Sequence, residues 1–153
     1  MKILVLSDTH GEIEEAIRVI RAERPDQILH LGDNFRDAED LEREFPMIPL
    51  CAVPGNNDWF TDEEKEKVLI FGETKVFLCH GHTTGVKRDL AVQIYKAASS
   101  GCTLSLFGHT HSPLNEEQSG IRLFNPGSLT HSGTYGVLTL NGTEINAEIK
   151  SSL

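Results

Sequence analysis

The segment ILVLSDTH, residues 3–10, decides the fold. Its first four residues are all apolar, which is typical of a strand that is covered on both faces of its sheet. Asp8 and His10 follow directly, where this strand would end. In sheets built from alternating strands and helices, ligands bind at the carboxyl ends of the strands, because the loops there converge on one crevice. The segment therefore predicts an α/β fold with a polar site at the end of its first strand.

Apolar runs alternate with amphipathic ones along the first two-thirds of the chain. The spacing of isoleucines predicts a helix over 12–24, which Pro25 ends. The other predicted helices are 37–44 and 87–99, and the other predicted strands are 27–31, 47–53, 68–71, 75–79, 103–107, 121–124, 135–140 and 144–149. The last three strands read as antiparallel, with a hairpin turn at Asn141-Gly142. Two mixed sheets packed face to face, with helices outside, accommodate this pattern in one domain over residues 1–153.

Composition and charge narrow the function. The chain has 153 residues, 39% hydrophobic and 24% charged, which is ordinary for one globular domain. Its net charge of −9 disfavours stable nucleic-acid binding, which needs a basic face, but permits a phosphate substrate because bound cations can reverse the local charge. No apolar run is long enough for a signal peptide or a membrane span, so we expect a cytoplasmic protein without a membrane partner. Three cysteines without a CxxC pair predict reduced, buried thiols.

Polar residues of a restricted kind follow five of the predicted strands. These segments are Asp8-Thr9-His10, Gly32-Asp33-Asn34, Gly55-Asn56-Asn57-Asp58, His80-Gly81-His82 and Gly108-His109-Thr110-His111. Residues two apart in extended backbone point to the same face, so the pairs Asp8/His10 and His109/His111 can each converge on a metal. Mixed carboxylate, imidazole and amide groups suit hard or borderline divalent ions.

This ordered series resembles the calcineurin-like metallophosphoesterase superfamily, and within it the small phosphodiesterases of the YfcE type. The resemblance runs from residue 1 to about 130 and includes Asn125-Pro126-Gly127-Ser128. It implies a four-layer α/β/β/α sandwich. It also implies seven metal-binding side chains: Asp8, His10 and His111 on one ion, Asn56, His80 and His109 on the other, and Asp33 bridging both.

The function implied by the resemblance is a metal-dependent phosphodiesterase with two divalent ions per chain. We expect Mn²⁺, although Ni, Fe, Zn and Co also accept nitrogen and oxygen ligands. Two ions about 3.5–4 Å apart would form a metal-bridging hydroxide for in-line attack on phosphorus. The expected substrate is a small phosphodiester, and the sequence leaves open whether the chain forms a homo-oligomer.

One position departs from the family pattern. Many larger members have, after the Gly-Asn pair, a histidine that is thought to protonate the leaving group, whereas this chain has Asn57. His82 is the candidate catalytic substitute; the alternative is a loop residue that orients its neighbours. Asn34 and Asp58 adjoin predicted ligands and are candidates to orient them.

Two other histidines, His30 and His131, are not expected to bind metal. His30 lies within a predicted strand and is expected to be structural, and His131 is expected to be solvated in a polar loop. The segment 125–127 is predicted to form a turn rather than a binding site. The charged run 62–67 is predicted to be a solvent-exposed segment that precedes a strand.

Two rival functions use the same fold. One is a metal-poor interaction scaffold that resembles the metallophosphoesterase-like subunit of retromer, in which the ligand set is eroded; here the set is complete. The other is a nuclease, which the acidic charge and the lack of an appended DNA-binding segment disfavour.

Overall fold

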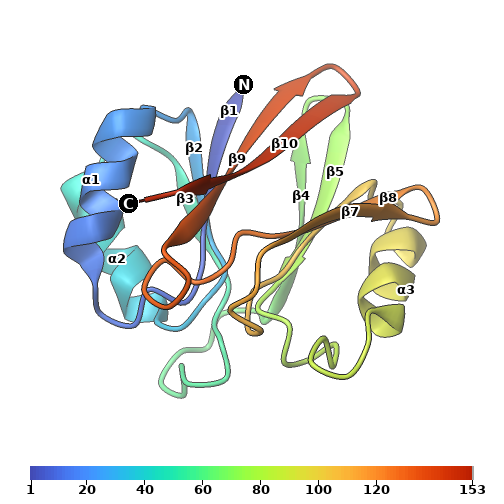
Figure 1. The fold of residues 1–153 in the computed structure, drawn as a ribbon, viewed down its shortest axis with the longest axis horizontal. Coiled ribbons are helices and arrows are strands. Elements are labelled where there is room, and N and C mark those ends of the chain that lie inside the picture. Colours follow the sequence, from blue (N-terminus) through green and yellow to red (C-terminus); the bar gives the residue numbers. More distant parts are fainter. Residues whose placement is uncertain (153) are drawn as a thin grey trace.

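Two five-stranded sheets stacked face to face form the centre of the molecule, seen in a computed structural model that describes residues 1–152 (Figure 1). The strands are β1 (Lys2–Leu6), β2 (Gln27–His30), β3 (Leu50–Ala52), β4 (Glu66–Phe71), β5 (Thr74–Cys79), β6 (Leu104–Leu106), β7 (Leu114–Gln118), β8 (Ile121–Asn125), β9 (Thr134–Asn141) and β10 (Glu144–Ser151). The first sheet has the order β10-β9-β1-β2-β3 and the second the order β4-β5-β6-β8-β7. Helices α1 (Ile13–Glu23) and α2 (Phe35–Glu44) flank the first sheet, and α3 (Ala91–Ser99) flanks the second.

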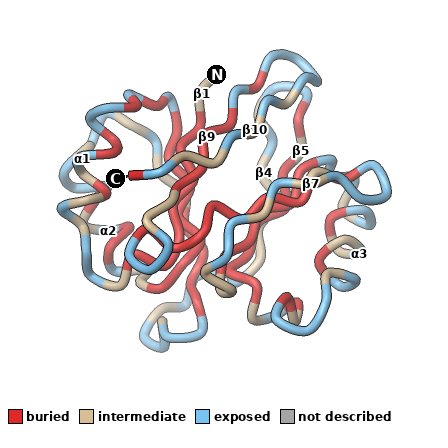
Figure 2. The backbone as a smooth tube through the Cα atoms, in the orientation of Figure 1, coloured by how far each residue is buried: buried red, intermediate tan, exposed pale blue. Residues whose placement is uncertain are grey.

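Strand β1 shows why the opening run is wholly apolar. Ile3 and Val5 belong to the core between the two sheets, whereas Leu4 and Leu6 pack with the apolar side chains of α1 and α2. All four are fully buried, as in a strand covered on both faces. Figure 2 shows mostly buried residues in the central strands and exposed residues concentrated in the outer helices and loops. The predicted four-layer sandwich is therefore confirmed.

Apart from shifts of up to three residues at element ends, three details differ from the predicted elements. Strand β7 was not predicted, because its sequence LNEEQ has one apolar residue and lies at an exposed edge of the sheet. Helix α3 begins at Ala91 rather than at residue 87, because the residues before it form turns. Strand β8 pairs in parallel with β6, so the last third of the chain is not wholly antiparallel.

The three thiols are free, and two of them, Cys79 and Cys102, are buried. Burial raises the pKa of Cys79 to about 12, so this thiol is inert at neutral pH. None of the helices described in residues 1–152 has the length and apolar character needed to cross a membrane.

The parallel pairing brings the predicted site together. Strands β1, β2 and β3 run parallel in one sheet, and β5, β6 and β8 run parallel in the other. Their carboxyl ends carry the loops that hold the conspicuous polar residues. These loops meet at the lower edge of the molecule in Figure 1.

Candidate metal centre

Asp8 lies buried among three histidines from different loops. Its Oδ1 atom is 3.1 Å from Nε2 of His111, 3.7 Å from Nε2 of His10 and 3.8 Å from Nε2 of His80. Its Oδ2 atom accepts a hydrogen bond from the backbone N–H of His109 at 3.2 Å. One carboxylate thus joins loops of both sheets. The backbone of Asp8, His10, His109 and His111 has positive φ, so their arrangement does not follow from the extended backbone on which the spacing argument relied.

The unprotonated ring nitrogen of His80 faces the carboxylates of Asp8 and Asp33. Its Nδ1 lies 2.7 Å from the carbonyl oxygen of Leu31, which can only accept, so Nδ1 carries the proton. Its Nε2 is therefore an acceptor; it lies 3.6 Å from Oδ2 of Asp33 and has no hydrogen-bond partner within residues 1–152. Buried polar atoms are rarely left unpaired, and here three acceptors from Asp8, Asp33 and His80 lie within 4.8 Å of one another. A divalent cation would satisfy all three, and the tautomer is that of a metal-binding histidine.

A second group of nitrogens lies beside the first. Nε2 of His10 is also buried and, within the described part of the chain, has no hydrogen-bond partner. Ring nitrogens of His10, His111 and His131 lie within 4.8 Å of one another, and the rings of His111 and His131 stack with centroids 4.5 Å apart. His131 is expected from the sequence to be solvated. It is exposed, yet it borders the site, a location that no sequence spacing indicates.

His82 and His109 complete the side of the site that belongs to the second sheet. The ring centroid of His80 is 5.0 Å from that of His109 and 5.6 Å from that of His82. Burial, with the nearby His80 and Lys87, lowers the pKa of His109 to about 4. Burial and His80 also lower the pKa of His82. Both rings are thus mainly neutral at pH 7, the form in which imidazole binds metals.

The loop after β3 brings Asn57 rather than Asn56 to Asp33. The backbone and side-chain N–H groups of Asn57 donate to the two oxygens of Asp33, at 3.1 and 2.8 Å. Asn56 is exposed, and its carbonyl oxygen accepts a hydrogen bond from the indole of Trp59 at 2.7 Å. Within residues 1–152, no hydrogen bond or ion pair joins the Asn56 side chain to the other six residues of the predicted set.

The backbone is strained at the site. Among residues 1–152, seven residues other than glycine have a positive φ, and five of them are predicted ligands. These five are Asp8 (55°), His10 (44°), Asp33 (48°), His109 (69°) and His111 (61°). Such conformations cost about 1–3 kcal/mol each and cluster at functional sites, where the surrounding structure holds them.

Two glycines let the loops approach the carboxylates closely. A Cβ atom on Gly55 would lie 2.0 Å from Oδ1 of Asp33, and one on Gly108 would lie 2.1 Å from Oγ of Ser7 and 2.8 Å from Oδ2 of Asp8. All three distances are below van der Waals contact. Glycine is therefore required at these two positions for the carboxylates to lie where they do.

Asp58 fixes the position of Asp33, as predicted for a residue that orients a ligand. Its Oδ2 accepts the backbone N–H groups of Asp33 at 2.9 Å and of Gly55 at 2.7 Å, and its Oδ1 accepts that of Phe35 at 2.9 Å. For Asn34, no side-chain cap hydrogen bond is present, so the same prediction gains no support there.

His30 is structural, as predicted. It is fully buried; Nδ1 accepts the backbone N–H of Gly32 at 3.1 Å, so Nε2 donates to the hydroxyl of Thr9 at 2.9 Å. That hydroxyl donates to Asp37, which also accepts the backbone N–H of Gly11. Burial lowers the pKa of His30 to about 4, so the ring is neutral. The network holds the loop that carries Asp8 and His10.

The loop after β8 supports the site from the other sheet. The amide of Asn125 donates to the carbonyl of Gly108 at 3.1 Å, and the hydroxyl of Ser128 donates to the carbonyl of Asp8 at 2.8 Å. Asn125 also accepts the backbone N–H of Gly127, which confirms the predicted turn. No sequence pattern indicates this supporting role, because the Ser128–Asp8 contact joins residues 120 positions apart and the Asn125–Gly108 contact joins two different loops.

Comparison with known proteins agrees with this geometry. The family described as the calcineurin-like phosphoesterase superfamily domain matches residues 1–143. A probable metallophosphoesterase of Bacillus subtilis, YsnB, is 33% identical over 149 residues, which cover 92% of this chain and 85% of the relative. The phosphodiesterase YfcE of Escherichia coli is 26% identical, with 90% and 87% covered. Zinc-bound Vps29 of Entamoeba histolytica has the same fold, with a TM-score of 0.78 over the whole of both chains at 19% identity. The chain therefore belongs to the calcineurin-like phosphoesterase superfamily.

Proposed function

We propose that this protein is a metal-dependent phosphodiesterase that holds two divalent ions between the loops of its two sheets. The observation that carries the proposal is the unpaired, buried Nε2 of His80, aimed at the carboxylates of Asp8 and Asp33. Asp8, His10 and His111 would hold one ion, and Asn56, His80 and His109 the other, with Asp33 between them. Asn56 is included because the family pattern has a ligand at this position; the geometry gives no separate reason, since Asn56 is exposed.

The charge of this residue set suits a phosphodiester. Asp8 and Asp33 carry two negative charges, whereas the histidines and Asn56 are neutral ligands. Two divalent cations would leave a net positive site that attracts an anionic ester. When bound, such ions lower the pKa of a coordinated water and withdraw charge from the phosphoryl oxygens. We propose Mn²⁺ first, with Ni, Fe, Zn and Co as chemically compatible substitutes.

The chain supplies further groups beside the site. Lys87 and Arg88 line a hollow of about 390 Å³ together with His82 and His109. Both cations are exposed, in a chain whose net charge is −9, and they can contact phosphate oxygens directly. His82 lines the same hollow, with its ring centroid 5.6 Å from that of His80, and the protonated fraction of its imidazole can give a proton to a leaving group. We assign it that catalytic role as part of the proposal.

We also propose a small phosphodiester substrate and a cytoplasmic location. The net charge of −9 disfavours a nucleic-acid substrate, whose binding needs a basic face. The scaffold alternative receives less support. All seven predicted ligands are present, and the likeness to Vps29 is one of fold alone.

The test measures metal content and turnover together. Calorimetric titration of chelator-treated protein with Mn²⁺ is expected to give two ions per chain. Chelation should abolish hydrolysis of bis(4-nitrophenyl) phosphate, and added Mn²⁺ should restore it. Full activity without metal would overturn the metal dependence, and two bound ions without turnover would favour the scaffold.

A further inference from the structure

A groove of about 640 Å³ adjoins the candidate metal centre on the side of the first sheet. It lies between the start of α2 and the loop that follows β3, and its walls include Arg36, Glu39, Trp59 and Phe60. Asn57 and Asp58, which contact Asp33, also line it. A substrate whose phosphate lay at the metal centre could therefore extend into this groove.

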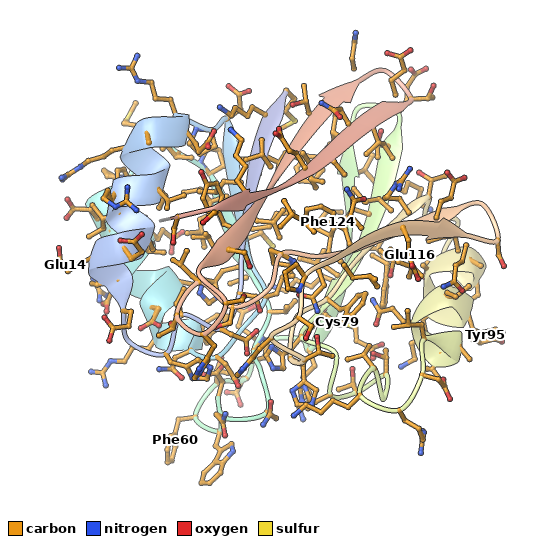
Figure 3. All side chains as sticks on the ribbon, in the orientation of Figure 1. Glu14, Phe60, Cys79, Tyr95, Glu116 and Phe124 are labelled. Carbon is orange, nitrogen blue, oxygen red and sulfur yellow. The ribbon has the colours of Figure 1, made fainter. Side chains whose placement is uncertain are left out.

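Two aromatic rings stand exposed at the groove. Trp59 is 77% exposed and Phe60 is fully exposed, and Phe60 projects from the lower edge of the molecule in Figure 3. Trp59 is held in place, because its indole N–H donates to the carbonyl of Asn56 at 2.7 Å. Exposed apolar side chains gathered beside a polar site mark a binding surface. Here they offer flat ring faces rather than an aliphatic surface.

The charged residues of the groove are complementary to a polar ring. The Arg36 side chain is exposed and makes no ion pair or hydrogen bond within residues 1–152, whereas Arg43 is paired with Asp40. A free guanidinium can donate to ring carbonyl oxygens or to a phosphate. The carboxylate of Glu39 can accept from ring N–H groups. Stacking faces with one donor and one acceptor at the edge match a nucleobase.

We infer that the groove binds the base of a nucleoside phosphodiester, stacked on Trp59 and Phe60, with the phosphate at the metal centre. The position of the phosphate rests on the proposed function; the binding of the base does not. A protein partner docking on the same rings is the competing occupant. The base is favoured because the groove is continuous with the loop that contacts Asp33.

Binding of the base can be measured without catalysis. Trp59 is the single tryptophan of the chain, so its fluorescence reports stacking directly. Thymidine 5′-phosphate should quench it saturably in chelator-treated protein, whereas ribose 5-phosphate should not. Phe60→Ala should weaken the quench about tenfold, since stacking contributes about 1–3 kcal/mol per base. Tyr95, an aromatic residue on α3 that is 71% exposed, gives the control: Tyr95→Ala should change nothing. No quench, or equal quench by the sugar phosphate, would overturn the inference.

Two esters with one leaving group extend the test to turnover. The ratio of kcat/KM for 4-nitrophenyl thymidine 5′-phosphate to that for methyl 4-nitrophenyl phosphate should fall about 5- to 100-fold in Trp59→Ala and in Phe60→Ala. Loss of the Trp59–Asn56 hydrogen bond alone would lower both values together and leave the ratio unchanged, which contradicts base binding. Turnover of the methyl ester without preference for thymidine would refute the groove and keep the proposed function. Quenching by the nucleotide without turnover by the Mn²⁺-loaded protein would support base binding in the groove and refute the proposed function.

Discussion

The side-chain amide of Asn57 donates a hydrogen bond to Oδ2 of Asp33 at 2.8 Å, and its backbone N–H donates to Oδ1 at 3.1 Å. A carboxamide thus holds a carboxylate at the position where the family resemblance implies a histidine in many larger members. An amide does not give up a proton at neutral pH. Asn57 therefore positions Asp33, and any proton for the leaving group must come from elsewhere, with His82 the nearest candidate.

This arrangement predicts a contrast between leaving groups. A general acid contributes about 10²–10⁴-fold, but only where the leaving group needs protonation. His82→Ala should therefore lower kcat/KM for dialkyl phosphates far more than for 4-nitrophenyl diesters, whose leaving group departs unaided. Asn57→His should raise kcat/KM for the alkyl esters selectively.

Asn57→Ala serves as the control, because it removes the contact with Asp33 without adding an acid. It should lower kcat/KM for both classes of ester alike. Equal losses on both classes in His82→Ala would instead assign His82 to binding or positioning.

Asp33 is predicted to affect both ions. The carboxylate of Asp33 is proposed to bridge the ions. Asp33→Asn should therefore weaken both binding steps of a calorimetric Mn²⁺ titration. His10→Ala should weaken one step and leave the other measurable, because His10 is assigned to a single ion. Asp8 lies near both groups of histidines, so Asp8→Asn is the informative comparison. If Asp8→Asn removed both ions and Asp33→Asn only one, the bridging assignment would pass to Asp8.

Asp58 should act on metal binding without touching the metal. Its carboxylate accepts three backbone N–H groups, and an amide replaces one of its two acceptor oxygens with a donor. Asp58→Asn is expected to lower the affinity for Mn²⁺ about 10- to 100-fold, as changes in residues that orient metal ligands do. Asp62→Asn, an exposed change in the same loop, should leave the affinity as it is. Unchanged affinity in Asp58→Asn would show that the loop keeps its shape without these bonds.

The sequence was most informative where burial dictates residue type. The four apolar residues of β1 require cover on both faces, and the structure places one pair against each neighbouring layer. The polar residues after β1, β2, β5 and β6 could be grouped because the carboxyl ends of parallel strands meet at one edge. The order of motifs then supplied the family.

Other features depend on contacts that no local pattern encodes. Strand β7 gains its structure from pairing with β8 rather than from its own polar sequence. His131 reaches the site because it lies in the loop between β8 and β9, where its ring stacks on His111. The conformation of the turn after β3 decides that Asn57, rather than Asn56, contacts Asp33. Spacing in the sequence can place such residues on a loop, but not the direction of their side chains.

Glu23 lies away from the metal centre, and its contacts make the stability of the fold depend on pH. Its two oxygens bind Lys2 at 2.8 Å, the hydroxyl of Tyr135 at 2.7 Å and Lys150 at 3.0 Å, which ties α1 to three strands. Burial raises the pKa of Glu23, but these hydrogen bonds outweigh it and lower the pKa to about 2. The unfolded chain binds this proton at a pKa of about 4.3. The stabilisation is therefore complete above about pH 5 and is lost as pH falls towards 2.

Glu23→Gln should accordingly reduce the free energy of unfolding at pH 7 by about 1–2 kcal/mol, less than the full value for such a pKa shift because both lysines are partly exposed. The difference from the wild type should shrink as pH falls from about 5 to about 2. Urea unfolding at pH 7, 5 and 3.5, with chelator present so that metal binding does not contribute, measures it. Glu144→Gln, an exposed change on β10, should show little difference at any pH. A difference for Glu23→Gln that stayed constant across this range would mean that its charge does not contribute, and that packing of the side chain accounts for the loss.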